Sequence, residues 1–182
     1  SKTANCAAVA KTSSMQANRA YAFLVAGLTF LVDQLGKWWV TGPLGLAVEG
    51  DQRYVLPIFN FTRTHNLGIS LGLFRADSDA ARWALVAVTA AIALSMLVWI
   101  LREPRHGDRI ALGMVLGGAV GNILDRIRLG YVVDFADLHF GSFRPFLVFN
   151  IADAAISIGV VILLVRAFLI RGTADPKENI NA

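Results

Sequence analysis

The chain has 182 residues, of which 55% are hydrophobic and only 16% are charged, and its mean hydropathy is +0.56. Soluble domains carry about a quarter charged residues, so this composition excludes an ordinary soluble protein. The net charge of +4 is spread over the ends of apolar segments, and we therefore expect no nucleic-acid partner. The single cysteine, Cys6, excludes an intrachain disulfide.

In chain order, a polar tail is followed by four apolar segments. Residues 1–19 are rich in Ser, Thr and Ala, and we expect them to be disordered. A bilayer crossing by a helix needs about 20 predominantly apolar residues, and four windows meet this requirement: Ala20–Val40, Ala81–Leu101, Arg109–Ile127 and Phe149–Ile170. The sequence thus predicts an all-α integral membrane protein, with one four-helix domain over residues 20–170 and a short tail over residues 171–182.

Basic residues predict the orientation of these helices. They precede the first window, occupy the short link between the second and third, and follow the fourth: Lys2, Lys11, Arg19, Arg102, Arg105, Arg109, Arg166, Arg171 and Lys177. The connections 41–80 and 128–148 mix both signs of charge. Cytoplasmic loops carry the excess of Lys and Arg. We therefore expect both termini in the cytoplasm and these two connections on the other side.

The two outer connections also contain strand-like segments. Phe59–Thr64 alternates apolar and polar residues, which is typical of a strand, and Tyr131–Phe135 is a second short candidate. Gly68–Gly72 suggests a turn. Phe140, Phe143 and Phe146 suit an aromatic belt at the membrane interface. A small β element and cap are expected at the outer membrane face.

Glycines in the third window recur at four-residue spacing, at positions 113, 117 and 121, with Gly118 beside them. Small residues at this spacing let helix backbones approach closely. We assign these glycines to packing.

Two aspartates, Asp134 and Asp153, have the strongest functional signal in the chain. Each borders an apolar segment, and neither has a basic residue within four positions. An ionisable residue at membrane depth is costly and indicates function. Two carboxylates that converge cannot both ionise easily, so they share a proton. This chemistry is that of an aspartic hydrolase.

The other polar residues of the spans converge on the same depth. Asp33 and Asn122 each lie 13 residues into a span of the same direction (33 − 20 and 122 − 109), which is about 20 Å at 1.5 Å per residue. Asp125 and Arg126 follow Asn122 within one turn, and we assign them a structural role in which Asp125 pairs with Arg126 or with a neighbouring donor. Asp33 and Lys37, one turn apart, have the same interpretation. Asp137 is expected to be a solvated loop residue.

Three other chemistries fit less well. Gly68-Ile69-Ser70-Leu71-Gly72 matches a serine nucleophile elbow, but that motif needs an α/β-hydrolase sheet, which four membrane helices cannot supply. The three histidines are scattered and form no H-E-x-x-H motif, so we expect no metal. Gly130, Asp134 and Asp137 match only half of the signature of alcohol phosphotransferases.

The sequence blocks together resemble the bacterial lipoprotein signal peptidase (signal peptidase II) family. The blocks occur in order across all four windows: Val32-Asp33-Gln34-Leu35-Gly36-Lys37, Asn66-Leu67-Gly68, Gly117 to Arg126 running on to Val133-Asp134-Phe135, and Phe149-Asn150-Ile151-Ala152-Asp153. Gly36 stands where the family usually has Ser or Thr, and Ile69-Ser70-Leu71 replaces a usual Ala-Ala-Phe.

The resemblance implies an aspartic endopeptidase of the bacterial inner membrane, with its active site on the extracytoplasmic side and Asp134 and Asp153 as its catalytic residues. It implies that Asn66, Gly68, Asn122, Arg126 and Asn150 line or support the site, and that Asp33 and Lys37 hold the first helix. The implied substrate is a prolipoprotein that already carries diacylglycerol, cleaved on the amino side of the lipidated cysteine. No cofactor is implied, membrane phospholipid is the expected surrounding, and we expect a monomer.

One rival from another class is a small proton-coupled carrier in which the acidic residues relay protons. Transporters usually contain two corresponding halves with broken helices at the midplane. Here the polar layer is off-centre and we find no internal repeat. Cleavage of a lipid-modified precursor in detergent distinguishes the two functions.

Overall fold

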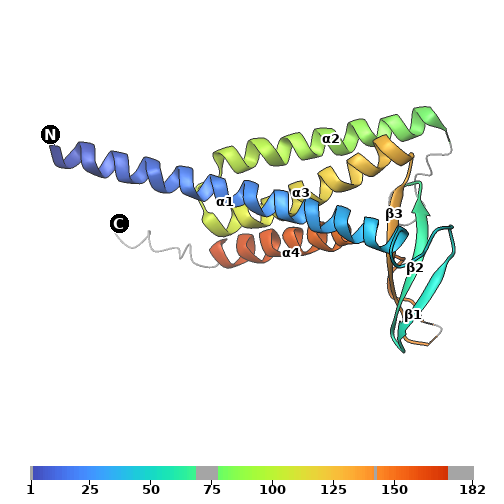
Figure 1. Cartoon of the computed structure of the whole chain (residues 1–182). Helices are drawn as coiled ribbons and strands as arrows, with labels where there is room; N and C mark the ends of the chain where they lie inside the picture. The colour runs from blue at the N-terminus through green and yellow to red at the C-terminus, as the bar shows by residue number, and fades with distance from the viewer. Residues whose placement is uncertain (1, 69–77, 142, 172–182) are drawn as a thin grey trace, which may run out of the picture.

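The protein is a bundle of four helices with a three-stranded sheet at one end (Figure 1). The computed structural model describes residues 2–68, 78–141 and 143–171. In chain order the elements are α1 (Lys2–Thr41), β1 (Gln52–Leu56), β2 (Phe59–Asn66), α2 (Asp79–Arg102), α3 (His106–Leu129), β3 (Val132–Leu138) and α4 (Ile151–Arg171). The N-terminal half of α1 and the end of α4 point away from the sheet.

Three helices in the described part of the chain are long and apolar enough to cross a membrane: α2, α3 and α4 through Leu169. Apolar side chains on α1, α2 and α4 are widely exposed, for example Leu28, Leu94 and Val161, as expected of surfaces that face lipid. The window Ala20–Val40 is part of α1 but is not among the three. A membrane protein with at least three candidate spans is therefore confirmed, and the fourth crossing stays a prediction.

The helix α1 begins at Lys2, so it runs through the segment for which the sequence predicts a disordered tail. This segment contains neither glycine nor proline, the two residues that most disfavour a helix interior. Helical backbone can therefore continue outward from the packed part of α1.

The helix α3 is the centre of the bundle and packs against the other three helices. Within its apolar stretch 56% of the residues are buried, compared with 17% in α2 and in α4. Glycine makes these contacts possible: a Cβ added to Gly113 would lie 2.5 Å from the carbonyl oxygen of Ala22 on α1, and one added to Gly118 would lie 2.6 Å from that of Ala152 on α4. The packing role predicted for these glycines is confirmed.

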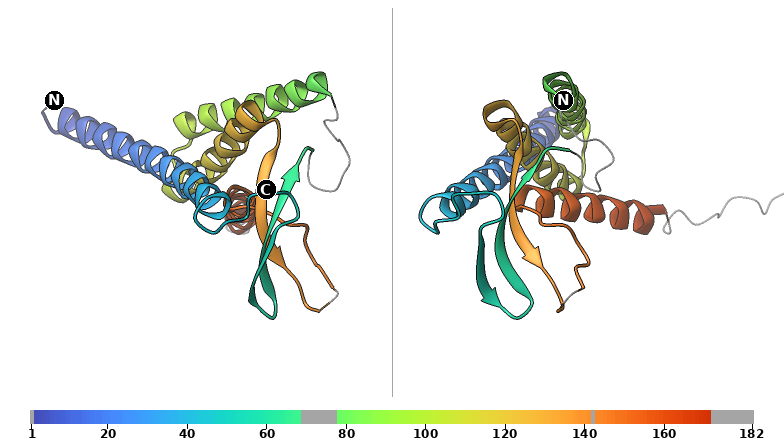
Figure 2. Two further views of the ribbon diagram at one scale, coloured as in Figure 1. Left: turned by 45° about the vertical axis from the view of Figure 1, so that its right-hand side comes forward. Right: turned by 90° about the vertical axis from the view of Figure 1, so that its right-hand side faces the viewer.

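The sheet has the order β1-β2-β3, and both pairs of strands are antiparallel. Figure 2 shows the strands crossing the end of the bundle. Both strands expected from the sequence exist, and both are longer than predicted. The strand β1 was not predicted, because its residues Gln52–Leu56 are all exposed and have no alternation of apolar and polar residues.

Two features attach the sheet to the helices. A small core of Val40, Leu46, Phe135 and Ala136 joins the end of α1 to β3. The backbone N–H groups of Phe135 and Ala136 both donate to the carbonyl of Phe149, at 3.1 and 2.7 Å. The second contact places the start of α4 beside the middle of β3.

Candidate active site

Asp134 lies in the middle of β3 and is 1% exposed. Its partner in the sheet register is Thr64 of β2. The carboxylate accepts one hydrogen bond on each oxygen: Asn66 Nδ2 donates to Oδ2 at 3.0 Å and Asn150 Nδ2 donates to Oδ1 at 2.6 Å. Burial raises the pKa of Asp134 to about 7, and the negative charge of Asp153 adds to this effect. A carboxyl group with this pKa can hold a proton at neutral pH.

Asp153 occupies the first turn of α4 as part of a reciprocal cap. The side-chain oxygen of Asn150 accepts from the backbone N–H of Asp153 at 2.8 Å, and Asp153 Oδ2 lies 3.4 Å from the backbone N–H of Asn150. This is the capping-box arrangement, in which the residue before a helix and the third residue within it satisfy each other. The spacing Asn150-x-x-Asp153 thus sets the start of α4 and the position of the carboxylate together.

Two asparagine side chains connect the carboxylates of Asp134 and Asp153. Asn122 Nδ2 donates to Asp153 Oδ1 at 2.8 Å. Asn150 Nδ2 donates to Asn122 Oδ1 at 3.1 Å as well as to Asp134. A continuous path of side-chain hydrogen bonds therefore runs from β3 to α4 through α3.

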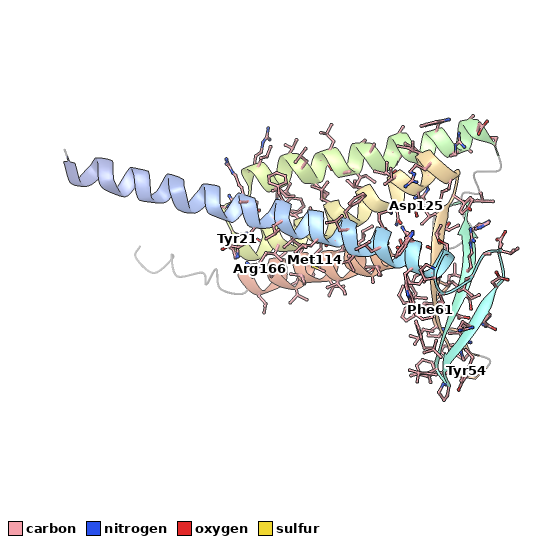
Figure 3. All side chains as sticks on the ribbon, in the orientation of Figure 1. Tyr21, Tyr54, Phe61, Met114, Asp125 and Arg166 are labelled. Carbon is pink, nitrogen blue, oxygen red and sulfur yellow. The ribbon has the colours of Figure 1, made fainter. Side chains whose placement is uncertain are left out.

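A buried ion cluster lies next to this path. Lys37 Nζ is 2.7 Å from Asp33 Oδ2 and 2.8 Å from Asp125 Oδ2, and it donates to Asn122 Oδ1 at 3.1 Å. Figure 3 labels Asp125 at the end of α3 nearest the sheet, far from Tyr21 and Arg166 at the other end of the bundle. The predicted Asp33–Lys37 pair is confirmed. Gln34 was not predicted to take part, although it donates to both Asp33 and Asp125.

Of the two partners expected for Asp125, Arg126 or a neighbouring donor, the structure has the second. Asp125 pairs with Lys37 and accepts from the backbone N–H of Val133 at 3.2 Å. Arg126 instead donates to the carbonyl of Gly68 at 2.8 Å. Consecutive residues on a helix do not face each other, so these two side chains point to different neighbours.

Asp137 is also not the solvated loop residue that the sequence suggests. The strand β3 continues to Leu138, and Asp137 is 1% exposed within it. Its Oδ2 accepts from the Thr62 hydroxyl at 3.0 Å and lies 3.3 Å from Arg144 Nη2. The assignment failed because these partners come from β2 and from the segment after β3, and local sequence does not show such pairing.

Gly68 is the last residue of the described range 2–68. Its backbone makes hydrogen bonds with two residues of the site, Asn66 and Arg126. Its backbone N–H donates to Asn66 Oδ1 at 3.0 Å, and its carbonyl accepts from Arg126. The turn and the serine motif at Gly68–Gly72 otherwise lie outside the described residues. Within the described ranges, no three His, Cys, Asp or Glu side chains are placed to hold a metal ion.

The chain is similar to known proteins over most of its length. The family model for signal peptidase (SPase) II matches residues 25–169. A lipoprotein signal peptidase of Sphingopyxis alaskensis is 50% identical over 164 residues, covering 88% of this chain and 94% of the relative. The chain belongs to the signal peptidase II family. Another lipoprotein signal peptidase, from Rhizorhabdus wittichii, is 50% identical over 165 residues, 91% of this chain and 95% of the relative.

A solved structure of a bacterial membrane enzyme has the same fold, with a TM-score of 0.71 and 26% identity over 88% of this chain and 94% of that chain. The protein is thus a membrane-bound peptidase of the signal peptidase II family.

Gly36, where the resemblance led us to expect Ser or Thr, lies in a closely packed place. A Cβ added there would lie 2.8 Å from Ile151 Cδ1 and 3.4 Å from Phe135 Cζ. Ile151 is the first residue of α4, and Phe135 follows Asp134. Glycine at position 36 therefore leaves space for these two apolar side chains, one from the start of α4 and one from β3.

Proposed function

We propose that this signal peptidase II removes the signal peptide from diacylglyceryl-modified prolipoproteins, cleaving on the amino side of the lipidated cysteine. The curated relatives are named lipoprotein signal peptidases. The observation that carries the proposal is the pair of carboxylates, Asp134 and Asp153, connected through Asn150 and Asn122 at the sheet end of the bundle. Asp134 and Asp153 are the catalytic aspartates.

The raised pKa of Asp134 supports a division of roles between the two carboxyl groups. Asp134 holds the proton and donates it toward the carbonyl oxygen of the scissile peptide bond. Asp153 accepts a proton from water, and the water oxygen forms a bond to the carbonyl carbon. The tetrahedral intermediate then collapses: Asp153 gives its proton to the leaving nitrogen, the carbon–nitrogen bond breaks, and Asp134 recovers its proton from the intermediate.

The neighbouring polar groups are proposed to support and orient this reaction. Asn66 and Asn150 hold Asp134, and Asn122 holds Asp153. Arg126 fixes the carbonyl of Gly68 at the end of β2. The backbone of Gly68 is therefore held beside Asn66, which contacts Asp134, and we place an extended substrate next to the carboxylates there.

For the membrane arrangement, we propose four crossings, both termini in the cytoplasm and the aspartate pair on the extracytoplasmic side of the bacterial inner membrane. The support is the position of three basic residues. Arg166 lies at the end of the bundle away from the sheet (Figure 3), and the link between α2 and α3, which holds Arg102 and Arg105, lies at the same end (Figure 1). Asp134 lies in the sheet at the opposite end, so the positive-inside rule directs it outward. A lipid-anchored substrate would present its scissile bond at that level. A single domain over residues 20–170 acting as a monomer is sufficient for this reaction.

The test uses Asp134→Asn and Asp153→Asn in purified protein with a lipid-modified precursor, scored by a mobility shift on a gel. Each variant is expected to lose at least about 100-fold in rate, because acid–base groups contribute about 10²–10⁴-fold, while keeping a cooperative thermal transition. Asp79→Asn, whose side chain is 86% exposed, and Ser70→Ala are the controls and should cleave normally.

Wild-type turnover by either folded aspartate variant would refute the catalytic pair. Loss of activity in folded Ser70→Ala would favour a serine mechanism. A wild-type protein that never cleaves the precursor would favour the carrier alternative.

A further inference from the structure

Lys37 is placed to control the geometry of Asp153 without touching it. Its ammonium group has three N–H donors and three acceptors around it: Asp33 Oδ2, Asp125 Oδ2 and Asn122 Oδ1. The side chain is 6% exposed. All three donors are therefore directed at protein groups, and one of the three points to the active-site amide of Asn122.

The amide of Asn122 has one orientation that suits its neighbours. Its oxygen accepts from Lys37 at 3.1 Å and from Asn150 Nδ2 at 3.1 Å, and its Nδ2 donates to Asp153 Oδ1 at 2.8 Å. If the amide were rotated by half a turn, its NH₂ group would face an ammonium and another donor, and its oxygen would face a carboxylate. Because Lys37 can only donate, it selects the orientation in which Asn122 donates to Asp153.

The same cluster also holds the backbone beside Asp153. Asp33 Oδ1 accepts from the backbone N–H of Ala152 at 2.9 Å, while Asp33 Oδ2 pairs with Lys37. Gly121 leaves the space for this contact, because a Cβ there would lie 2.7 Å from Asp33 Oδ2. The helix α1 thus contacts two groups that position Asp153. Asp33 holds the backbone N–H of Ala152, and Lys37 contacts Asn122, which donates to Asp153.

We infer that Lys37 is a positioning residue of the reaction: by fixing the amide orientation of Asn122, it directs a hydrogen-bond donor at Asp153 Oδ1. The oxygen that accepts a proton from water is then Oδ2, which has the long contact of 3.4 Å with the backbone N–H of Asn150. This role goes beyond holding α1 in the bundle. It rests on the proposed role of Asp153 in catalysis.

The test is a double-mutant cycle on cleavage of the lipid-modified precursor, with Lys37→Met, Asn122→Ala and the double variant. If Lys37 acts through Asn122, each single change lowers kcat by about 10-fold or more with KM little changed, and the double variant is no slower than Asn122→Ala alone. Two residues that act as one unit are non-additive. If the two losses multiply, Lys37 acts independently of Asn122 and the inference is overturned.

Lys37→Met leaves two buried carboxylates without their cation and can prevent folding, so a second variant is needed. Asn122→Asp is nearly isosteric and keeps an acceptor for Lys37, but it replaces the donor that faces Asp153 with an oxygen. It should keep a thermal transition close to that of the wild type and lose kcat by at least about 10-fold. Wild-type kcat in Asn122→Asp would overturn the inference, whatever Lys37→Met does. Inactivity of Asp134→Asn and Asp153→Asn tests the proposed function separately, so the two can fail independently.

Discussion

Asp134→Asn should weaken the pH dependence of stability as well as abolish cleavage. Burial raises the pKa of Asp134 from its ordinary value of 3.8 to about 7. Between these values the folded protein binds a proton at Asp134 that the unfolded chain does not. This linkage stabilises the fold fully below pH 3.8, and the contribution is lost as the pH rises through about 7.

The size of the effect follows from the two pKa values of Asp134. Between pH 5 and pH 8 the titration of this one group should lower the free energy of unfolding by about 2–3 kcal/mol, since one pKa unit corresponds to about 1.4 kcal/mol. For a chain of this length, 1 kcal/mol changes Tm by about 2–4 °C. The Tm of the wild type should therefore fall by about 5–10 °C more than that of Asp134→Asn across this range.

The assay is thermal unfolding in detergent at a series of pH values, followed by intrinsic fluorescence or circular dichroism. Asp79→Asn is the matched control, because it removes an exposed carboxylate and should keep the wild-type pH dependence. Equal loss of Tm by wild type and Asp134→Asn between pH 5 and pH 8 would show that Asp134 is not a buried group that retains its proton. In the wild type, cleavage should also decline as the pH rises through about 7, because Asp134 then loses the proton that it donates to the substrate.

Sequence reasoning was informative where the type of residue alone indicates its structural role. Gly113 and Gly118 were assigned to close packing because only a missing side chain allows a backbone carbonyl so near, and the structure has these contacts. The sequence also singled out Asp153, because a carboxylate in an apolar segment is costly; the structure connects it to Asp134 through Asn122 and Asn150, and its catalytic role stays a prediction. Its spacing to Asn150 also encodes the cap that holds it.

The misses at charged residues share one cause, which is pairing between distant segments. Asp125 was expected to pair with Arg126 or a neighbouring donor, and the sequence did not show that this donor is Lys37 on α1. Asp137 was assigned to solvent, although β2 and Arg144 enclose it. Local spacing predicts which residues share a helix face or a turn, but the partners of a buried charge depend on which helices and strands become neighbours.

Two further predictions address packing and substrate anchoring. Gly117→Ala should lower Tm clearly, because a Cβ there would overlap the carbonyl of Ala26 on α1. Gly27→Ala is the control: a Cβ at position 27 meets nothing within 4 Å, so Tm should be unchanged or slightly raised. Equal effects of the two substitutions on Tm would contradict the packing role. The diacylglyceryl group should be required for fast cleavage, because it holds the scissile bond at the level of Asp134 and Asp153 and thereby replaces a search through the solution with a fixed orientation. An unmodified precursor with the same peptide sequence should be cleaved far more slowly, and a chelator should leave the rate with the lipidated precursor unchanged, because water is activated by a carboxylate. Equal rates for the two precursors would show that the lipid does not position the substrate, and inhibition by a chelator that added metal reverses would replace the aspartate pair with a metal mechanism.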